Sequence, residues 1–221
     1  MARSFPRCFD HNWRTLPYPE IVLGDAAASP FVAGTAFHKY SGQPSVMTTL
    51  HDAFPDKRIF FSEGSEFGVR GAAEMVAIFN NYASTYSAWV TMLDSNMQPN
   101  AGPFRPQPTM LELNAVTKEV TFRFEYFMTG QFSKFVRRGA RRVLSQVLGS
   151  DDDRKQGLSV VAFVNGDEAC LGDNQNAVVV VVVNDAAAPA SLRLKWGDQE
   201  SRAVVVDPAS VATFRWPLLG R

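Results

Sequence analysis

The first 136 residues alternate between short apolar runs and longer amphipathic stretches. Four runs have the length and composition of strands: Arg7–Trp13, Val32–Tyr40, Arg58–Gly64 and Ser87–Asp94. The intervening and following stretches are expected to be a loop with a short helix and three further helices: Pro17–Val32, then Pro44–Phe54, Gly71–Tyr86 and Phe122–Val136. Strands that alternate with helices predict βα units around a parallel sheet.

The pattern changes after residue 136, where apolar runs are separated by Asn, Asp, Gly and Pro. In one run, Leu192, Leu194 and Trp196 alternate with Arg193 and Lys195, as in a half-buried strand. We therefore expect an α/β domain over residues 1–136 and an all-β domain over residues 137–221. A sandwich is the simplest architecture for the second domain.

Composition and charge exclude several classes of protein. The chain has 221 residues, 46% of them hydrophobic, and a formal net charge of +0, which argues against broad contact with nucleic acid. The longest apolar run, Ala177–Val183, is too short to cross a membrane. The basic run Lys134–Arg142 is interpreted as a solvated helix end and loop, with a polyanion site as the alternative.

The sequence indicates neither a disulfide framework nor a metal site. Cys8 and Cys170 lie far apart, and the three histidines His11, His38 and His51 lack the spacing of zinc ligands. We expect no metal ion and no cofactor. The N-terminus has no apolar segment typical of a secretory signal.

Polar side chains follow each predicted strand. Asp10, His11 and Asn12 end the first strand, His38, Lys39 and Tyr40 the second, Glu63 the third and Asp94 the fourth. The carboxyl ends of parallel strands meet at one edge, where (β/α)8 barrels have their active sites. A solvated carboxylate at a strand end is the plain alternative for Glu63.

Three stretches carry a resemblance to a known family. "VAGTAFHKYSGQPSVMTTLHDAFPDKRIFFSEGSEFG", "AWVTMLDSNMQPNAGP" and "QFSKFVRRGARRV" are similar, in this order, to the C-terminal half of glycoside hydrolase family 30, which includes the glucosylceramidases. The resemblance covers residues 7–216. It implies roughly strands 5 to 8 of a (β/α)8 TIM barrel, followed by a β-sandwich domain.

The resemblance also implies roles for individual residues. Glu63 matches the family's catalytic nucleophile. Five others match residues that line the substrate cleft, with Trp89 in the sugar subsite: Trp89, Tyr40, His38, Asn12 and Asp10. Lys39 stands where the family commonly has an aromatic residue, and Trp89 as a core residue is the alternative to a sugar platform.

The family's acid/base glutamate lies in an Asn-Glu-Pro stretch on the fourth barrel strand, and this sequence contains no Asn-Glu pair. Four residues are weighed as substitutes: Glu66, Glu74, Asp94 and His38. The resemblance implies that the chain begins near the fifth strand. Half a barrel leaves apolar surface uncovered, so we expect poor folding alone, self-association through the open barrel edge, or a partner that supplies the other half.

Two functions follow from the resemblance. The first is hydrolysis of glucosylceramide or a related β-glucoside with retention of configuration. The second is a non-catalytic fragment with a sugar-binding, lipid-binding or structural role. An unrelated α/β enzyme is the third hypothesis. The family is mostly lysosomal or secreted, so the absence of a signal here leaves the location open.

Overall fold

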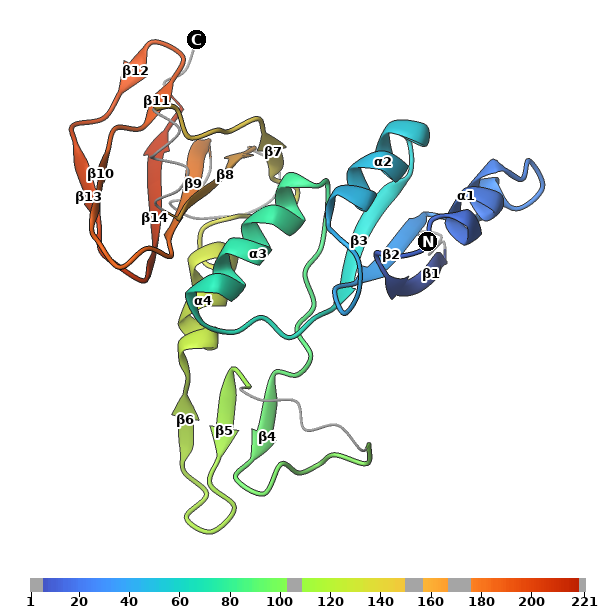
Figure 1. Cartoon of the computed structure of the whole chain (residues 1–221), viewed down its shortest axis with the longest axis horizontal. Helices are drawn as coiled ribbons and strands as arrows, with labels where there is room; N and C mark the ends of the chain where they lie inside the picture. Colours follow the sequence, from blue (N-terminus) through green and yellow to red (C-terminus); the bar gives the residue numbers. More distant parts are fainter. Residues whose placement is uncertain (1–5, 103–108, 150–156, 167–175, 219–221) are drawn as a thin grey trace. The chain divides into compact units, whose positions relative to one another are not determined.

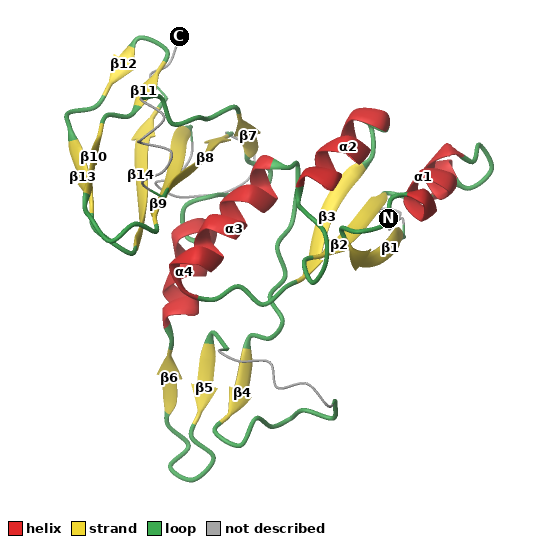
Figure 2. Ribbon diagram, viewed as in Figure 1, coloured by secondary structure: helices red, strands yellow, loops and turns green. Residues whose placement is uncertain are grey.

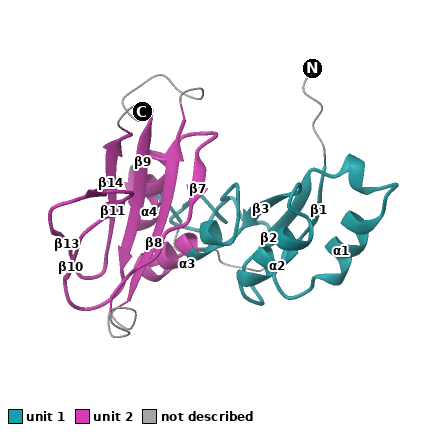
Figure 3. Cartoon of the chain, turned by 90° about the horizontal axis from the view of Figure 1, so that it is seen from above, with its two compact units in different colours: residues 1–65, 77–119 teal, residues 66–76, 120–221 magenta. Residues whose placement is uncertain are grey.

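The computed structural model describes residues 6–102, 109–149, 157–166 and 176–218, so Pro103 of the quoted "QPNAGP" stretch and Cys170 lie outside the described residues (Figures 1 and 2). The chain forms two compact units (Figure 3). Unit 1 contains residues 1–65 and 77–119, and unit 2 contains residues 66–76 and 120–221. The domain boundary after residue 136 stays a prediction. Among the described residues, no helix has the length and apolarity needed to span a membrane.

Unit 1 contains the expected parallel sheet. Three strands, β1 (Arg7–Asn12), β2 (Gly34–His38) and β3 (Arg58–Glu63), pair in the order β1-β2-β3. The connections contain α1 (Pro17–Gly24), the 3-10 helix η1 (Ser29–Phe31) and α2 (Ser45–Ala53). Every strand pair is parallel, which confirms the βα units predicted from the sequence. Phe37, Phe61, Met47 and Leu50 form the centre of the apolar core.

The fourth parallel segment differs from the prediction. Residues 83–89, rather than Ser87–Asp94, run beside β3. Backbone N–H groups of Ser84, Ser87 and Trp89 donate to carbonyls of Ile59, Phe61 and Gly64 at 2.8, 3.2 and 2.9 Å. The pairing consists of isolated bridges. The segment contains the polar residues Ser84, Thr85 and Ser87, so it does not form the apolar run from which a strand is predicted. The apolar pattern therefore placed this strand several residues too late.

A helix precedes the fourth segment, and three short strands and a further helix lie between that segment and the β-rich region. Helix α3 (Gly68–Asn80) ends before the predicted Tyr86, and Tyr82 has a left-handed backbone with φ of 70°. Strand β4 (Met92–Asp94) pairs in parallel with β5 (Leu111–Leu113), and β6 (Val120–Phe122) precedes α4 (Phe124–Ser133). The sequence reading missed β5 and β6 because three residues are too few to show a period.

The C-terminal region forms the expected antiparallel sandwich. Its main sheet has the order β14-β9-β8-β7, with the bounds Ser210–Pro217, Ala177–Asn184, Leu158–Asn165 and Arg141–Val143. Two hairpin-like pairs accompany it: β10 (Ala190–Leu192) with β13 (Val204–Val206), and β11 (Lys195–Trp196) with β12 (Gln199–Glu200).

Strand β9 is buried over its whole length. Val178, Val180 and Val182 belong to an apolar cluster that includes Val206 of β13. Their neighbours Val179, Val181 and Val183 point to the opposite face and are also fully buried. On neighbouring β14, the Thr213 hydroxyl donates to the Gln131 carbonyl of α4 at 2.8 Å. The unbroken valine run is therefore a strand that is covered on both faces.

Candidate active site

Two β-bulges interrupt the parallel sheet at the same level. Between β1 and β2, Phe9 pairs with Ala36 and His11 pairs with Phe37, so Asp10 is an extra residue without a partner in the register. Phe9 and Asp10 have positive φ angles of 76° and 54°. Non-glycine residues rarely adopt this conformation, and bulges re-aim side chains near functional sites. The bulge therefore sets the direction of the Asp10 side chain.

The second bulge lies on the other side of β2. Phe37 pairs with Phe61 and His38 pairs with Glu63, which leaves Ser62 as the extra residue of β3. Because side chains alternate along a strand, an inserted residue changes the face to which its neighbours point. The shift brings His38 and Glu63 into register at the carboxyl ends of their strands.

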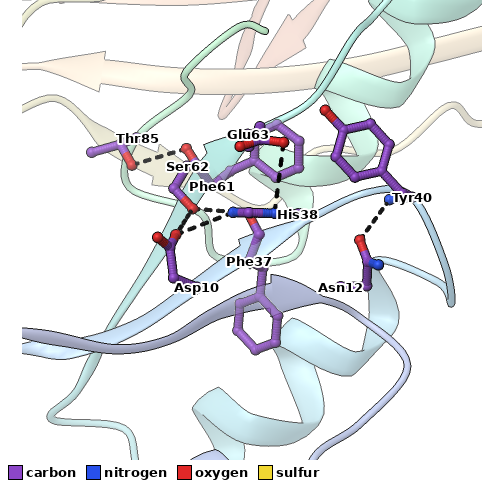
Figure 4. A network of polar contacts seen from close by, with 9 residues as sticks. All are labelled: Asp10, Asn12, Phe37, His38, Tyr40, Phe61, Ser62, Glu63 and Thr85. Carbon is purple, nitrogen blue, oxygen red and sulfur yellow. Dashed lines mark hydrogen bonds and ion pairs between the residues drawn. The ribbon is translucent and has the colours of Figure 1, made fainter. Parts of the chain in front are cut away.

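The side chains at these bulges form a polar cluster (Figure 4). The Ser62 hydroxyl donates to Asp10 Oδ1 at 2.6 Å and lies 3.3 Å from the Phe37 carbonyl oxygen. His38 Nε2 is 3.2 Å from the same Asp10 oxygen, and His38 Nδ1 is 3.9 Å from Glu63 Oε1. A single imidazole therefore lies between two carboxylates, one on each neighbouring strand.

The electrostatics of the cluster favour an ionised Asp10. The Ser62 hydrogen bond is the main cause that lowers the pKa of Asp10, and the hydrogen bond and charge of His38 act in the same direction. Burial opposes them by raising the pKa of this carboxyl. The Asp10 side chain is 67% exposed, whereas those of His38 and Glu63 are 15% and 27% exposed. Glu63 is thus shielded but still reachable from solvent.

Asn12 and Tyr40 meet beside this cluster (Figure 4). Asn12 Oδ1 accepts a 3.0 Å hydrogen bond from the backbone N–H of Tyr40. The Tyr40 ring packs edge-on against the His38 ring, with 6.2 Å between the centroids, and the residue is 50% exposed. Asn12 therefore holds the turn after β2 in the position that presents an aromatic ring beside the cluster.

Hydrogen bonds connect Trp89 to the segment that follows Glu63. Its N–H donates to the Gly64 carbonyl at 2.9 Å, and its own carbonyl accepts the Ser65 hydroxyl at 2.5 Å. A Cβ at Gly64 would lie 2.5 Å from the Phe61 ring, so a residue larger than glycine would have to displace that ring. Trp89 is 47% exposed, which excludes the core role that the sequence left open within unit 1.

The substitutes weighed for the acid/base residue differ in their surroundings. Asp94 Oδ1 accepts hydrogen bonds from the backbone N–H groups of Asn96 and Gln98 at 2.8 and 2.7 Å, so this carboxylate stabilises the turn that follows it. Glu66 and Glu74 belong to unit 2, whereas Glu63 belongs to unit 1. His38 remains beside Glu63 itself. Within the described residues, no group of three His, Cys, Asp or Glu side chains is arranged to hold a metal ion.

Sequence reasoning overlooked Ser62 and the connection that it makes. The quoted "FFSEG" placed Ser62 directly before the candidate nucleophile, which was the available signal. Simple alternation assigns neighbouring residues to opposite faces and predicts no bulge. Ser62 and Asp10 are 52 residues apart, and their hydrogen bond depends on two β-bulges at the same level of the sheet. The pattern of apolar and polar residues does not predict these bulges.

Comparison with known proteins agrees with this architecture. Residues 139–214 match the family model described as "Glycosyl hydrolase family 30 beta sandwich domain". An endo-1,6-β-D-glucanase of Neurospora crassa is 27% identical over 96% of this chain. A putative glucosylceramidase 4 of Caenorhabditis elegans is 28% identical over 78%. The matched region and these relatives make the chain a relative of the glycoside hydrolase family 30 proteins.

A solved structure has the same fold as this chain. The structure of an endo-β1,6-glucanase superposes with a TM-score of 0.82 over 97% of this chain, at 24% identity. The chain covers 49% of that structure, 44% of the Neurospora protein and 36% of the Caenorhabditis protein. It therefore spans less than half the length of each of these three relatives, and it contains parallel β/α units followed by the family 30 sandwich.

Proposed function

We propose that Glu63 is the nucleophile of a retaining β-glycoside hydrolase. The observation that carries the proposal is the position of its carboxylate at the carboxyl end of β3, with His38 Nδ1 at 3.9 Å. A rigid strand end holds a nucleophile well for attack. The resemblance to family 30 supports the reaction class, because it implies that Glu63 corresponds to the family's nucleophile.

The first chemical step is attack by a Glu63 oxygen on the anomeric carbon of the sugar. The C1–O bond to the leaving group breaks, and a glycosyl ester of Glu63 forms. Ordinary glycosides also need an acid that protonates the leaving oxygen. Because the chain lacks the family's Asn-Glu pair, the sharpest probe is a sugar whose leaving group departs without a proton.

For the substrate, we propose a β-glucoside such as glucosylceramide or a β-1,6-linked glucan. Among the relatives, one is named as a β-1,6-glucanase and another as a putative glucosylceramidase. Glucose is the sugar common to these names. Trp89 and Tyr40 present exposed aromatic rings that suit the apolar face of a sugar.

The test is covalent labelling of the 221-residue chain with 2-deoxy-2-fluoro-β-glucosyl fluoride. Fluoride leaves without protonation, and the 2-fluoro group slows hydrolysis of the ester, so mass spectrometry detects one added fluoroglucosyl group. We expect labelling of the wild type at Glu63 and none in Glu63→Gln. Glu63→Asp keeps the carboxylate but shortens it, and should label more slowly.

Glu20→Gln is the matched control, because Glu20 is an exposed glutamate in the first turn of α1. It should label like the wild type. Labelling that persists in Glu63→Gln, or an unlabelled wild-type chain that retains its fold, would overturn the assignment of Glu63 as nucleophile.

Sugar binding without hydrolysis is the second candidate, and the exposure of Trp89 and Tyr40 favours it. In that case, the folded chain binds glucosides while Glu63 remains unlabelled. Tryptophan fluorescence titrated with a β-glucoside then shows saturable binding, and Trp89→Ala removes it. This result separates a binding protein from a hydrolase on the same preparation.

A further inference from the structure

The polar cluster contains two residues that are not needed for the chemistry of a glycosidase nucleophile. Asp10 and Ser62 are the extra residues of the two bulges that flank β2, and they hydrogen bond to each other at 2.6 Å. The Asp10 oxygen that accepts this bond also contacts His38 Nε2 at 3.2 Å. Ser62 is therefore linked to the imidazole through one carboxylate oxygen.

We propose that Asp10 and Ser62 are positioning residues, which fix the His38 ring so that its Nδ1 edge faces the Glu63 carboxylate. The inference rests on the proposed role of Glu63 for its effect on reaction rate. It assigns Asp10 to holding a neighbouring side chain rather than to contacting sugar.

The geometry explains how the ring is held. An imidazole has two ring nitrogens on different edges, and the hydrogen bond at one nitrogen fixes the direction of the other. With Nε2 facing Asp10, rotation of the ring would break the 3.2 Å contact before Nδ1 could turn away from Glu63. The aromatic rings of His11 and Tyr40 pack edge-on against His38, with centroids 6.4 and 6.2 Å away.

Ser62 is needed because Asp10 itself is open to solvent. An exposed carboxylate samples several rotamers, and water competes for its oxygens. The short bond from Ser62 Oγ ties Oδ1 to β3, the same strand that carries Glu63. Asp10 of β1 and Glu63 of β3 are thus brought to opposite nitrogens of one ring on the intervening β2.

The backbone supports the same interpretation. Asp10 and its neighbour Phe9 occupy the left-handed region, which non-glycine residues rarely adopt. Such conformations persist where surrounding contacts require them and cluster at functional sites. Phe9 packs edge-on against the buried Phe37 ring at 5.5 Å, so the core holds the bulge in place.

The first experiment follows His38 by NMR and needs no enzymatic activity. The chain has three histidines, so ring signals are assigned with His11→Gln and His51→Gln. Ser62 makes no direct hydrogen bond to the ring and acts through Asp10. We expect Ser62→Ala to shift the His38 ring signals in the same direction as Asp10→Asn. Ser62→Thr keeps the hydroxyl, so its His38 signals should stay at the wild-type positions.

A double substitution tests whether the two residues act as one unit. If Ser62 works only through Asp10, adding Ser62→Ala to Asp10→Asn shifts the His38 signals no further. Asp52→Asn, the same chemical change at an exposed position of α2, is the matched control and leaves the signals unchanged. The proposal would be overturned if the His38 signals did not shift in Ser62→Ala. It would also be overturned if the shifts of the two single variants added up in the double variant.

The second experiment measures the rate of labelling by 2-deoxy-2-fluoro-β-glucosyl fluoride. A misplaced reacting group costs up to about a hundredfold in rate. We expect Asp10→Asn and Ser62→Ala to slow the bond-forming step roughly tenfold to a hundredfold, with little change in the reagent concentration that gives half-maximal rate. Equal rates in both variants and the wild type would contradict a positioning role.

The two hypotheses fail in different ways. If Glu63→Gln still labels, Glu63 is not the nucleophile, and the NMR experiment still decides whether Asp10 and Ser62 hold His38. If Glu63→Gln abolishes labelling while neither variant affects His38 or the rate, the nucleophile assignment survives and the positioning role is wrong. Ser62→Ala removes a single oxygen, so it serves as the principal variant if Asp10→Asn does not fold.

Discussion

Ser62 and Asp10 come from strands that do not pair with each other, yet the Ser62 hydroxyl donates a 2.6 Å hydrogen bond to Asp10 across β2. Each residue is the extra member of a bulge, and the two bulges occur at the level of Phe37 and His38. Regular pairing would keep these side chains a full strand apart. The coincidence of the bulges is what assembles the cluster beside Glu63.

This hydrogen bond makes a prediction about acidity. Ser62→Ala removes the main cause that lowers the pKa of Asp10, so that pKa should rise toward its ordinary value. Titration of the Asp10 carboxyl carbon by NMR measures the shift directly. Ser62→Thr, which retains the donor, should keep the low pKa. An unchanged Asp10 pKa in Ser62→Ala would contradict the hydrogen bond.

The same shift connects stability to pH. A carboxyl whose pKa is lower in the folded state stabilises the fold at pH above its unfolded pKa, and this contribution is lost as pH falls through the folded pKa. The loss of stability in Ser62→Ala should therefore be larger at neutral pH than at a pH below the folded pKa of Asp10. Urea denaturation at both pH values measures it, and an equal loss at both would contradict the linkage.

Gly34 should tolerate no side chain. A Cβ there would lie 1.8 Å from the Arg58 carbonyl oxygen, which belongs to the backbone of the paired strand β3. Gly34→Ala should break the β2–β3 pairing and yield little folded protein. Gly24→Ala is the control, because nothing lies within 4 Å of its Cβ. Circular dichroism of both purified variants would show the difference, and a well-folded Gly34→Ala would refute the prediction.

Gly64 is restricted by a side chain rather than by the backbone. A Cβ would meet the fully buried Phe61 ring at 2.5 Å, so Gly64→Ala must displace that ring or the segment that carries Trp89. Overpacking of this kind costs about 1 to 3 kcal/mol of unfolding free energy. Urea denaturation measures the cost. A loss below about 0.5 kcal/mol would mean that the ring moves freely, contrary to its burial.

Asn184 should stabilise the sandwich from its buried position in β9. Its Nδ2 lies within hydrogen-bond distance of the carbonyls of Ala188, Val206 and Asp207, and its Oδ1 accepts the N–H of Ala186. Asn184→Leu leaves the buried carbonyl of Val206 without this donor and should cost about 1 to 3 kcal/mol of unfolding free energy, because the other partner groups are only partly buried and can bond to water. Asn114→Leu, at an exposed turn, should cost less. Equal losses in urea denaturation would refute the prediction.

Trp89 should contribute to binding rather than to stability. Because Trp89 is 47% exposed, Trp89→Ala should change the unfolding free energy by less than about 1 kcal/mol. The loss of a stacking surface should raise the reagent concentration that gives half-maximal labelling rate by roughly five- to tenfold. Trp89→Phe keeps a ring and should lie between the two. A large loss of stability without loss of affinity would identify Trp89 as a structural residue.

The sequence predicted the fold class well because the local order of apolar and polar residues reflects which side chains are buried. The runs around Phe37 and Phe61, and the valines of β9, are apolar because both faces of these strands are covered. The exception is instructive. Residues 83–89 form the fourth parallel segment with serine and threonine, since isolated bridges require hydrogen bonds from the backbone and place little demand on the side chains.

By itself, the sequence determined that β/α units precede a β-rich module, and it singled out Glu63, His38 and Asp10 at strand ends. Hydrophobic periodicity and residue type are local properties, so they can be read without coordinates. Only the tertiary structure decided which strand ends meet and at which register. A bulge depends on how two distant strands align, and the Asp10–Ser62 hydrogen bond exists because two such alignments coincide on either side of β2.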